Sequence, residues 1–338
     1  MATERLVAVS YPADEDYSAI NSEILGGAAT LSYTHGLSDS ERLAALQRSE
    51  VLLAWELAKE LPRDALHQAP DLRFVQLLSA GVDAIDFSAL PDWPVFASNA
   101  GAYAPEMAEH VLAMALSLAK RLPQRHAAMA AGRFEKWHPS LVLEGAVCGI
   151  LGFGGIGVAT ARLMRAFGAR IYALNRTGET SEPVEFAGTL ADLDLVLGIS
   201  DVIVVSLPLT LTTRGLLGPR EMSLLKPTAI VVNVARGAIV DQAALYEFLS
   251  TNPQAGAGID TWWHEPTGDS PFQVDYPFFE LPNVIGSPHN SSIVPGTMLA
   301  AARVAAQNVL RYLNGDPITG MVRREDYVPD QDRGQPAR

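Results

Sequence analysis

The sequence predicts an α/β protein of two domains, each built on a parallel sheet with helices on its faces. The chain has 338 residues, and a domain typically takes about 150 residues, so two domains are expected. Short apolar runs alternate with helical segments in the first hundred residues, and a second, stronger series of the same kind starts at Gly145. Such alternation is typical of parallel sheets, whose successive strands are joined by helices.

The first series contains short strands and one well-capped helix. Residues 39–47 are expected to be helical, because Ser38 or Asp39 can serve as the N-cap. The strands of this series are predicted at 6–10, 30–34, 51–55, 74–78 and 95–98.

A long amphipathic helix over 105–121 connects the two series. Leu122-Pro123 should end it, and residues 124–138 form a polar stretch. A last helix over 295–312 could pack on either domain. In the second series strands are predicted at 147–151, 170–174, 201–207, 229–234, 257–260 and 283–286, with helices such as 155–167 and 241–250 between them.

Composition and charge exclude several classes of partner. The net charge of −13 argues against a broad nucleic-acid surface, although a few buried cations could still bind a small anion. Neither a signal-peptide pattern nor an apolar run of ~20 residues is present, so no membrane partner is expected. Cys148 is the only cysteine, which excludes an internal disulfide and favours a cytoplasmic protein in which this thiol is a core residue.

A glycine pattern follows the first strand of the second series. Gly152 would allow the tight turn, Gly154 the approach of a pyrophosphate, and Gly157 the close packing of helix on strand. The following helix would offer free N–H groups to the phosphates. The alternative is a glycine-rich turn without a ligand. The predicted dinucleotide cradle comprises Gly152, Phe153, Gly154, Gly155, Ile156 and Gly157.

The next strand ends in Asn175-Arg176-Thr177, where a carboxylate that binds the adenosine ribose is usual. A carboxylate there would repel a 2′-phosphate, whereas Asn175 would not. Arg176 could pair with that phosphate and Thr177 could donate a hydroxyl, so NADP(H) is favoured over NAD(H). The alternative for Arg176 is a solvent-exposed loop charge.

Three later segments end strands of the second series and carry Arg236, Glu265 and His289. In an open α/β sheet the carboxyl ends of the strands face the ligand crevice, so these residues can meet there. Alone, Arg236 could form a surface ion pair and His289 could be an ordinary loop residue. The segments are Val231–Asp241, Gly258–Pro266 and Gly286–Asn290.

Together with the cradle, these segments resemble the D-isomer-specific 2-hydroxyacid dehydrogenase family. The resemblance rests on Asn-x-Ala-Arg-Gly-x-x-Val-Asp at Asn233–Asp241, on Asp260–Pro266 and on Pro288-His289. Asn99-x-Gly101 and Ala108-Glu109-His110 are similar to its crossover segment. The resemblance implies two Rossmann-like or flavodoxin-like domains with the active site in the cleft between them. The implied division is 1–99 plus 290–330 for substrate, 100–289 for NAD(P), and a disordered tail over 331–338.

The resemblance also implies a reaction: hydride transfer between nicotinamide and C2 of a small 2-oxo or 2-hydroxy acid, of the glyoxylate or hydroxypyruvate type, without a metal. Arg236 would hold the substrate carboxylate and polarise the C2 oxygen. His289 would be the general acid or base, because its pKa lies near neutrality. Glu265 would orient the imidazole and stabilise its charged form.

Further contacts are implied in both domains. Backbone amides of Ser79, Ala80 and Gly81 would bind the substrate carboxylate, and Trp55 would either shape the pocket or fill the core. The remaining implied cofactor contacts are Ser206, Leu207, Pro208, Val234, Ala235, Arg236, Asp260 at the nicotinamide, and His289.

The sequence departs from the family pattern in places. Asn175 replaces the ribose-binding acid, Ser206 stands where many relatives have histidine, and Ser291-Ser292 follow His289 where small residues are common. Glu265 argues against the formate dehydrogenase branch, which has glutamine there. Two alternatives remain on this fold: a dinucleotide-sensing co-repressor-like protein and a phosphite dehydrogenase.

The resemblance further implies a homodimer that forms through the second domain. Candidates for its surface are the helix 105–121 and the segment Phe134–Trp137. Trp137 could reach the active site of a neighbouring subunit.

Overall fold

A computed structural model describes residues 5–137, 139–266, 268 and 270–329. The chain divides into two compact units. Unit 1 comprises residues up to Tyr103 and from Val294 onward, and unit 2 comprises Ala104–Ile293. The expected boundaries after residues 99 and 289 lie a few residues earlier in the chain. The predicted disordered tail, 331–338, lies outside the described residues.

Unit 1 is built on a parallel sheet of five strands in the order β2-β1-β3-β4-β5. This order is that of flavodoxin-like doubly wound sheets, in which ligands bind outside the carboxyl ends of the strands. All five predicted strands are present, each slightly shorter than expected. They are β1 (Leu6–Val9), β2 (Thr30–Tyr33), β3 (Val51–Ala54), β4 (Phe74–Leu77) and β5 (Val95–Ala97).

Helices cover the sheet of unit 1. The Ser38 hydroxyl and the Glu41 carboxylate form a reciprocal capping box at the start of α2, as the N-cap analysis anticipated. α10 packs against α1 and contacts β3 and β4, so the last helix belongs to unit 1. α1 has no predicted counterpart. The helices are α1 (Glu15–Leu25), α2 (Asp39–Gln47), α3 (Leu57–Glu60) and α10 (Thr297–Asn314).

Unit 2 contains a parallel sheet of seven strands in the order β12-β11-β10-β9-β6-β7-β8. Its first six strands in chain order follow the Rossmann arrangement, with the change of direction between β6 and β9. Only β8 was not predicted. The strands are β6 (Val147–Leu151), β7 (Arg170–Leu174), β8 (Phe186–Gly188), β9 (Val202–Val205), β10 (Ile230–Asn233), β11 (Gly256–Ile259) and β12 (Val284–Gly286).

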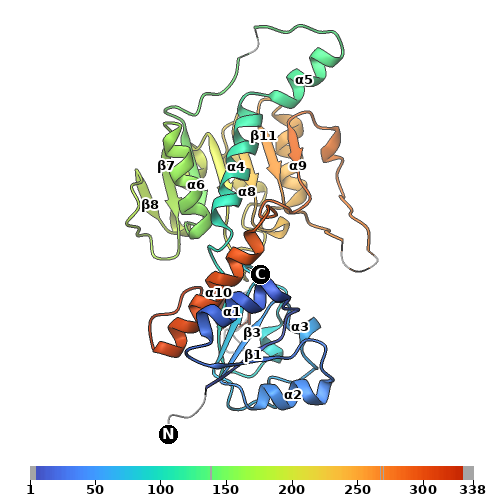
Figure 1. Cartoon of the computed structure of the whole chain (residues 1–338). Helices are drawn as coiled ribbons and strands as arrows, with labels where there is room; N and C mark the ends of the chain where they lie inside the picture. Colours follow the sequence, from blue (N-terminus) through green and yellow to red (C-terminus); the bar gives the residue numbers. More distant parts are fainter. Residues whose placement is uncertain (1–4, 138, 267, 269, 330–338) are drawn as a thin grey trace. The chain divides into compact units, whose positions relative to one another are not determined.

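The two faces of this sheet are covered by different helices (Figure 1). α4 and α6 contribute Met114 and Met164 to one apolar core, whereas α7, α8 and α9 contribute residues such as Phe248 to the other. Cys148 is buried in the first of these cores, and burial raises the pKa of its thiol to about 12, as expected for a core residue. The helices are α4 (Ala104–Ala119), α6 (Gly155–Ala166), α7 (Leu193–Ile199), α8 (Pro219–Leu224) and α9 (Gln242–Thr251).

No helix was predicted in the polar stretch that follows Pro123. A separate helix, α5 (Leu122–Ala130), occupies this part of the chain. Arg121 adopts a left-handed conformation with φ 53°, which ends α4 and turns the chain. Pro123 then lies in the first turn of α5, where its fixed φ favours a helix and its missing N–H costs nothing. Pro123 therefore begins a helix, and Arg121 ends the one before it.

Candidate active site

The glycine cradle lies between β6 and α6. Gly152 has φ +100°, and a Cβ there would come within 2.6 Å of the Ser206 carbonyl oxygen. A Cβ on Gly157 would lie 2.2 Å from the Gly152 carbonyl oxygen, so neither position tolerates a side chain. Gly154 differs, because no atom lies within 4 Å of the place a Cβ would take. The backbone therefore turns tightly around open space at Gly154, which fits the approach of a pyrophosphate.

The start of α6 adds to this fit. α6 begins at Gly155, directly after the turn, and its first N–H groups have no partner within the helix. From the neighbouring strand end, the Ser206 hydroxyl donates a hydrogen bond of 2.8 Å to the Gly152 carbonyl oxygen. Ser206 therefore ties the end of β9 to the cradle. Leu207 and Pro208 follow it at the same edge of the sheet.

The loop after β7 is folded by Asn175. Its Oδ1 accepts from the backbone N–H of Thr177 at 3.0 Å and of Gly178 at 2.7 Å, and its Nδ2 donates to the Glu179 carbonyl oxygen at 2.8 Å. The side chain thus builds a turn in place of the usual carboxylate. Arg176 and Thr177 are exposed on this turn, beside the strand that carries the cradle.

The three predicted catalytic residues follow three neighbouring strands of unit 2. Arg236 follows β10, Glu265 follows β11 and His289 follows β12. The His289 Nδ1 lies 2.7 Å from the Glu265 Oε2. The charge of Arg236 contributes to lowering the pKa of Glu265, which places the guanidinium within electrostatic reach of this pair. The structure therefore brings the three together at one edge of the sheet.

Two opposing effects determine the protonation of Glu265. Burial raises the pKa of its carboxyl group, but hydrogen bonds from His289 and from the Trp262 N–H, at 2.9 Å, outweigh burial and hold the pKa below its ordinary value. Glu265 is therefore a carboxylate at neutral pH and accepts a hydrogen bond from the N–H at Nδ1 of the imidazole. The Nε2 atom is left for a substrate, and the side chain of His289 is 40% exposed.

The backbone around Arg236 explains the signature motif. The Asn233 side chain donates to the Arg236 carbonyl oxygen and accepts from the Ala235 N–H, both at 3.0 Å, which fixes the turn after β10. A Cβ on Gly237 would lie 2.4 Å from the Trp262 carbonyl carbon. Glycine at this position lets the segment of Arg236 pack directly against the segment that leads to Glu265.

Asp260 has a structural function that the sequence did not reveal. Its side chain is fully buried, and its oxygens accept from the Ser287 hydroxyl at 2.5 Å and from the N–H groups of Asn290 and Ser291 at 3.1 and 3.3 Å. Asp260 thus shapes the loop that carries His289. Its contact with nicotinamide stays a prediction.

A second histidine lies next to Glu265 in the sequence but is directed elsewhere. The His264 Nε2 lies 3.1 Å from the Asp275 Oδ2. His264 thus belongs to a different hydrogen-bonded pair.

The predicted substrate residues lie in unit 1. Ser79, Ala80 and Gly81 follow β4 and are half-buried. Trp55 follows β3, packs partly against the apolar core, and donates its backbone N–H to the carboxylate of Glu60 at 3.0 Å. Both segments thus lie at the carboxyl end of the unit 1 sheet.

Three polar residues near these sites were given no role from the sequence. Glu60 supports the Trp55 loop, Ser287 contacts Asp260, and His110 contacts Ser287. His110 stands in the motif Ala108-Glu109-His110, and Ser287 directly precedes Pro288-His289. The position of these two residues inside recognised motifs was the only sequence signal for them.

A glycine cradle and an imidazole–carboxylate pair beside a guanidinium, all on one Rossmann sheet, define a nucleotide-dependent dehydrogenase. A model of the D-isomer specific 2-hydroxyacid dehydrogenase NAD binding domain matches residues 112–291. A glyoxylate reductase of Thermococcus gammatolerans is 32% identical over 278 residues, which are 80% of this chain and 81% of the relative. One of Aeropyrum pernix is 33% identical over 294 residues, covering 84% and 86%. The chain belongs to the D-isomer specific 2-hydroxyacid dehydrogenase family.

Solved structures agree with this assignment. A D-isomer specific 2-hydroxyacid dehydrogenase from Xanthobacter autotrophicus Py2, in complex with NADPH and MES, aligns with a TM-score of 0.75 and 28% identity over 95% of this chain and 100% of the other. The family resemblance and the two-domain α/β fold predicted from the sequence are therefore confirmed. The protein is an NAD(P)-dependent oxidoreductase of small 2-hydroxy or 2-oxo acids. Within the described residues, no helix combines the length and apolar character needed to span a membrane.

Proposed function

We propose that the protein reduces a short 2-oxo acid, glyoxylate or hydroxypyruvate, with NADPH. The observation that carries this proposal is the 2.7 Å contact between His289 and Glu265, on the same sheet edge as Arg236. A proton donor and an anion-binding fork in one place suit a substrate with a carboxylate next to a carbonyl. The names of the similar glyoxylate reductases support a substrate of this size.

In this mechanism each residue has a distinct task. The bound nicotinamide supplies the hydride. Arg236 binds the substrate carboxylate through its planar fork and polarises the C2 oxygen. His289 donates the Nε2 proton to that oxygen, and the Glu265 carboxylate stabilises the imidazolium before transfer and keeps the Nδ1 proton in place afterwards. General acid catalysis of this kind contributes about 10²–10⁴ in rate.

Other residues bind and orient the two ligands. The backbone amides of Ser79, Ala80 and Gly81 bind the carboxylate, and Trp55 limits the length of the substrate. The turn from Gly152 to Gly157 holds the pyrophosphate at the start of α6. The nicotinamide side is formed by Ser206, Leu207, Pro208, Val234, Ala235 and Asp260.

The preference for NADPH rests on the loop after β7. The Asn175 side chain folds this loop without a charge, so position 175 does not repel a 2′-phosphate as a carboxylate would. The exposed Arg176 supplies a guanidinium and Thr177 a hydroxyl for that phosphate. The protein is therefore expected to oxidise NADPH faster than NADH.

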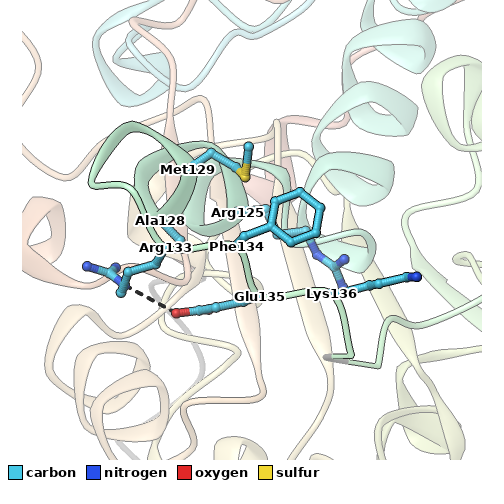
Figure 2. Close-up of a pocket in the computed structure, with 7 residues that line it drawn as sticks. All are labelled: Arg125, Ala128, Met129, Arg133, Phe134, Glu135 and Lys136. Atoms are coloured by element: carbon cyan, nitrogen blue, oxygen red, sulfur yellow. Dashed lines mark hydrogen bonds and ion pairs between the residues drawn. The ribbon is translucent and has the colours of Figure 1, made fainter.

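The protein acts as a homodimer through α5 and the segment that follows it. Met129, Phe134 and Trp137 are 56%, 77% and 85% exposed, and the first two line a shallow hollow with Arg125, Arg133 and Lys136 (Figure 2). Exposed aromatic and sulfur side chains of this kind favour association. Sedimentation of the wild type and of Phe134→Asp tests the dimer, because the variant should be monomeric.

A steady-state assay tests the enzymatic proposal. Purified protein is mixed with NADPH or NADH and with glyoxylate, hydroxypyruvate, pyruvate or phosphite, and the loss or gain of nicotinamide absorbance is followed. Glyoxylate or hydroxypyruvate with NADPH should give the highest kcat/KM. His289→Ala should bind NADPH as the wild type does and lose turnover. Full activity of His289→Ala, or turnover of phosphite alone, would reject the proposal.

A further inference from the structure

A chain of hydrogen bonds runs beneath the loop of His289 and starts on α4. The His110 Nε2 lies 2.9 Å from the Ser287 Oγ, and the Ser287 Oγ lies 2.5 Å from the Asp260 Oδ1. His110 Nε2 is itself 3.8 Å from this oxygen. The three residues come from α4, from the end of β12 and from the end of β11, and therefore connect elements that are distant in sequence.

The direction of these bonds follows from the surroundings of Asp260. Both of its oxygens accept backbone N–H groups, from Asn290 and Ser291, so the carboxylate acts as an acceptor throughout. Ser287 therefore donates its single hydroxyl proton to Asp260. A lone pair of the Ser287 oxygen then accepts a hydrogen bond from the Nε2–H of His110, which fixes the tautomer of His110.

This chain ends on the backbone of His289. The N–H of His289 donates to the Asp260 carbonyl oxygen at 2.8 Å, and the next two N–H groups donate to the Asp260 carboxylate. His289 has φ +51°, a left-handed conformation that a residue with a side chain rarely adopts. Asp260 therefore stabilises an unfavourable backbone conformation, and that conformation presents the imidazole to Glu265.

We propose that His110 is a positioning residue, which holds Ser287 and Asp260 so that the loop 287–291 presents His289 to Glu265. The proposal rests on the proposed role of His289 as the proton donor. His110 does not touch the His289 ring in any contact of the described residues, so its effect is transmitted through Ser287 and Asp260. Removing the Nε2 donor leaves the Ser287 oxygen without this partner and lets the hydroxyl rotate away from Asp260.

The packing of α4 does not depend on the imidazole of His110. Val111, Met114 and Ala115 of α4 are buried in the core, whereas the side chain of His110 is 26% exposed. An aromatic ring of similar size can therefore replace the imidazole while α4 stays in place. His110→Phe removes the N–H donor, and His110→Gln retains an amide N–H near the position of Nε2.

The test compares these two variants in NADPH-dependent reduction of glyoxylate. His110→Phe should lower kcat about tenfold or more, while the Kd of NADPH and the thermal midpoint change little. His110→Gln should recover most of the lost kcat. His264→Phe is the matched control, because His264 is also paired with an acid in unit 2 but lies outside this network, and it should retain wild-type kcat. The double variant Ser287→Ala/His110→Phe should lose no more kcat than either single variant, because both residues act through the same chain of hydrogen bonds.

A second measurement requires neither cofactor nor substrate. In protein labelled with ¹⁵N-histidine, the signals of His289 are assigned by comparison with His289→Ala. His110→Phe should shift the Nδ1 resonance of His289 away from its value in the pair with Glu265, and His110→Gln should restore it.

Two results would overturn the role of His110. The first is that His110→Phe retains the wild-type kcat and an unshifted His289 signal. The second is that His110→Phe and His110→Gln lose the same amount of kcat. Loss of the proposed function itself gives a different pattern, because His289→Ala would then remain active in the same assay.

Discussion

Each of the two sheets carries a buried acid at the carboxyl end of its strands. In unit 1, Glu60 accepts from the Ser10 hydroxyl at 2.6 Å and from the backbone N–H groups of Trp55 and Glu56 at 3.0 and 2.6 Å. In unit 2, Asp260 accepts from one hydroxyl and two backbone N–H groups in the same manner. Both acids satisfy the N–H groups of a loop that leaves the sheet, where no strand partner is available.

The two loops differ in what they present. The loop shaped by Asp260 carries His289, an ionisable group whose partner Glu265 is fixed on the next strand end. The loop shaped by Glu60 carries the backbone and the ring of Trp55, with no proton to transfer at neutral pH. The same structural solution therefore supports proton transfer in one unit and the shape of a surface in the other. Loss of either acid should destabilise its unit, but only loss of Asp260 should stop the chemistry.

The largest expected effect comes from replacing these two acids. Asp260→Ala leaves three hydrogen-bond donors without this acceptor and frees the loop of His289. We expect a decrease in kcat of about 10²–10⁴, the typical contribution of a positioned proton donor. Both variants should lower the free energy of unfolding by a similar amount, about 1–3 kcal/mol for each unsatisfied group. Of the kinetic constants, however, Glu60→Ala should affect mainly KM. Urea unfolding and steady-state kinetics on glyoxylate measure the two quantities. If Glu60→Ala lowered kcat as much as Asp260→Ala, the distinction between the loops would be lost.

A smaller effect is expected from Glu265→Gln. Glutamine keeps the shape but removes the charge that stabilises the imidazolium, so kcat should fall by about 10–100-fold. The pKa of Glu265 is lowered in the folded protein. Its stabilising contribution is therefore complete above the unfolded pKa of about 4.3 and is lost as the pH falls through the lower folded value.

The pH dependence supplies the control for this variant. Urea unfolding at neutral pH should show Glu265→Gln to be less stable than the wild type. In acid, below the folded pKa, both chains carry a neutral group at this position and the difference should disappear. A constant difference across this range would mean that Glu265 acts through packing and not through charge.

The segments of unit 2 that carry short motifs were easier to predict from the sequence than the weakly patterned helices α1 and α5. The cradle and the residues Arg236, Glu265 and His289 lie in short motifs whose spacing is dictated by local geometry, as the close contact at Gly237 illustrates. In contrast, α1 has a polar sequence in which only Ile20 and Leu25 are buried apolar residues, so its periodicity is weak. α5 was missed because Pro123 can either end a helix or begin one.

The polar networks could not be predicted, because their partners are distant in sequence. Asp260 ends a strand, which suggested a contact with the cofactor, but its oxygens accept N–H groups from a loop 30 residues later. Glu60 accepts from Ser10, 50 residues earlier. Whether a carboxylate faces outward or supports a loop is decided by tertiary packing, which a sequence pattern does not contain.

A third prediction concerns an ionic contact that only unit 2 is proposed to make. Arg176→Ala removes a charge-assisted contact to the 2′-phosphate, which is typically worth about 1.5–3 kcal/mol, or about 10–100-fold in kcat/KM for NADPH. The kcat/KM for NADH should change little, because NADH lacks that phosphate. Parallel assays with both cofactors measure the ratio of kcat/KM for NADPH to kcat/KM for NADH in the wild type and in the variant. An equal loss with NADH and NADPH would show that Arg176 supports the loop and does not recognise the phosphate.

The smallest effect is expected from Ser206→Ala, which tests how far the cradle depends on the neighbouring strand. The hydroxyl donates to the Gly152 carbonyl oxygen at 2.8 Å, and the loss of one such bond typically costs about 0.5–1.5 kcal/mol. If that energy is used to hold the cradle, the Kd of NADPH should rise by about 2–10-fold with kcat unchanged. Fluorescence titration of NADPH measures this change. Ser223→Ala, which removes an exposed bond to the Arg220 carbonyl oxygen far along the chain, is the control and should leave the Kd unchanged. An unchanged Kd in Ser206→Ala would mean that steric exclusion at Gly152 and Gly157 alone defines the turn. Unit 2 would then need no polar support for its cradle, although it needs Asp260 for its catalytic loop.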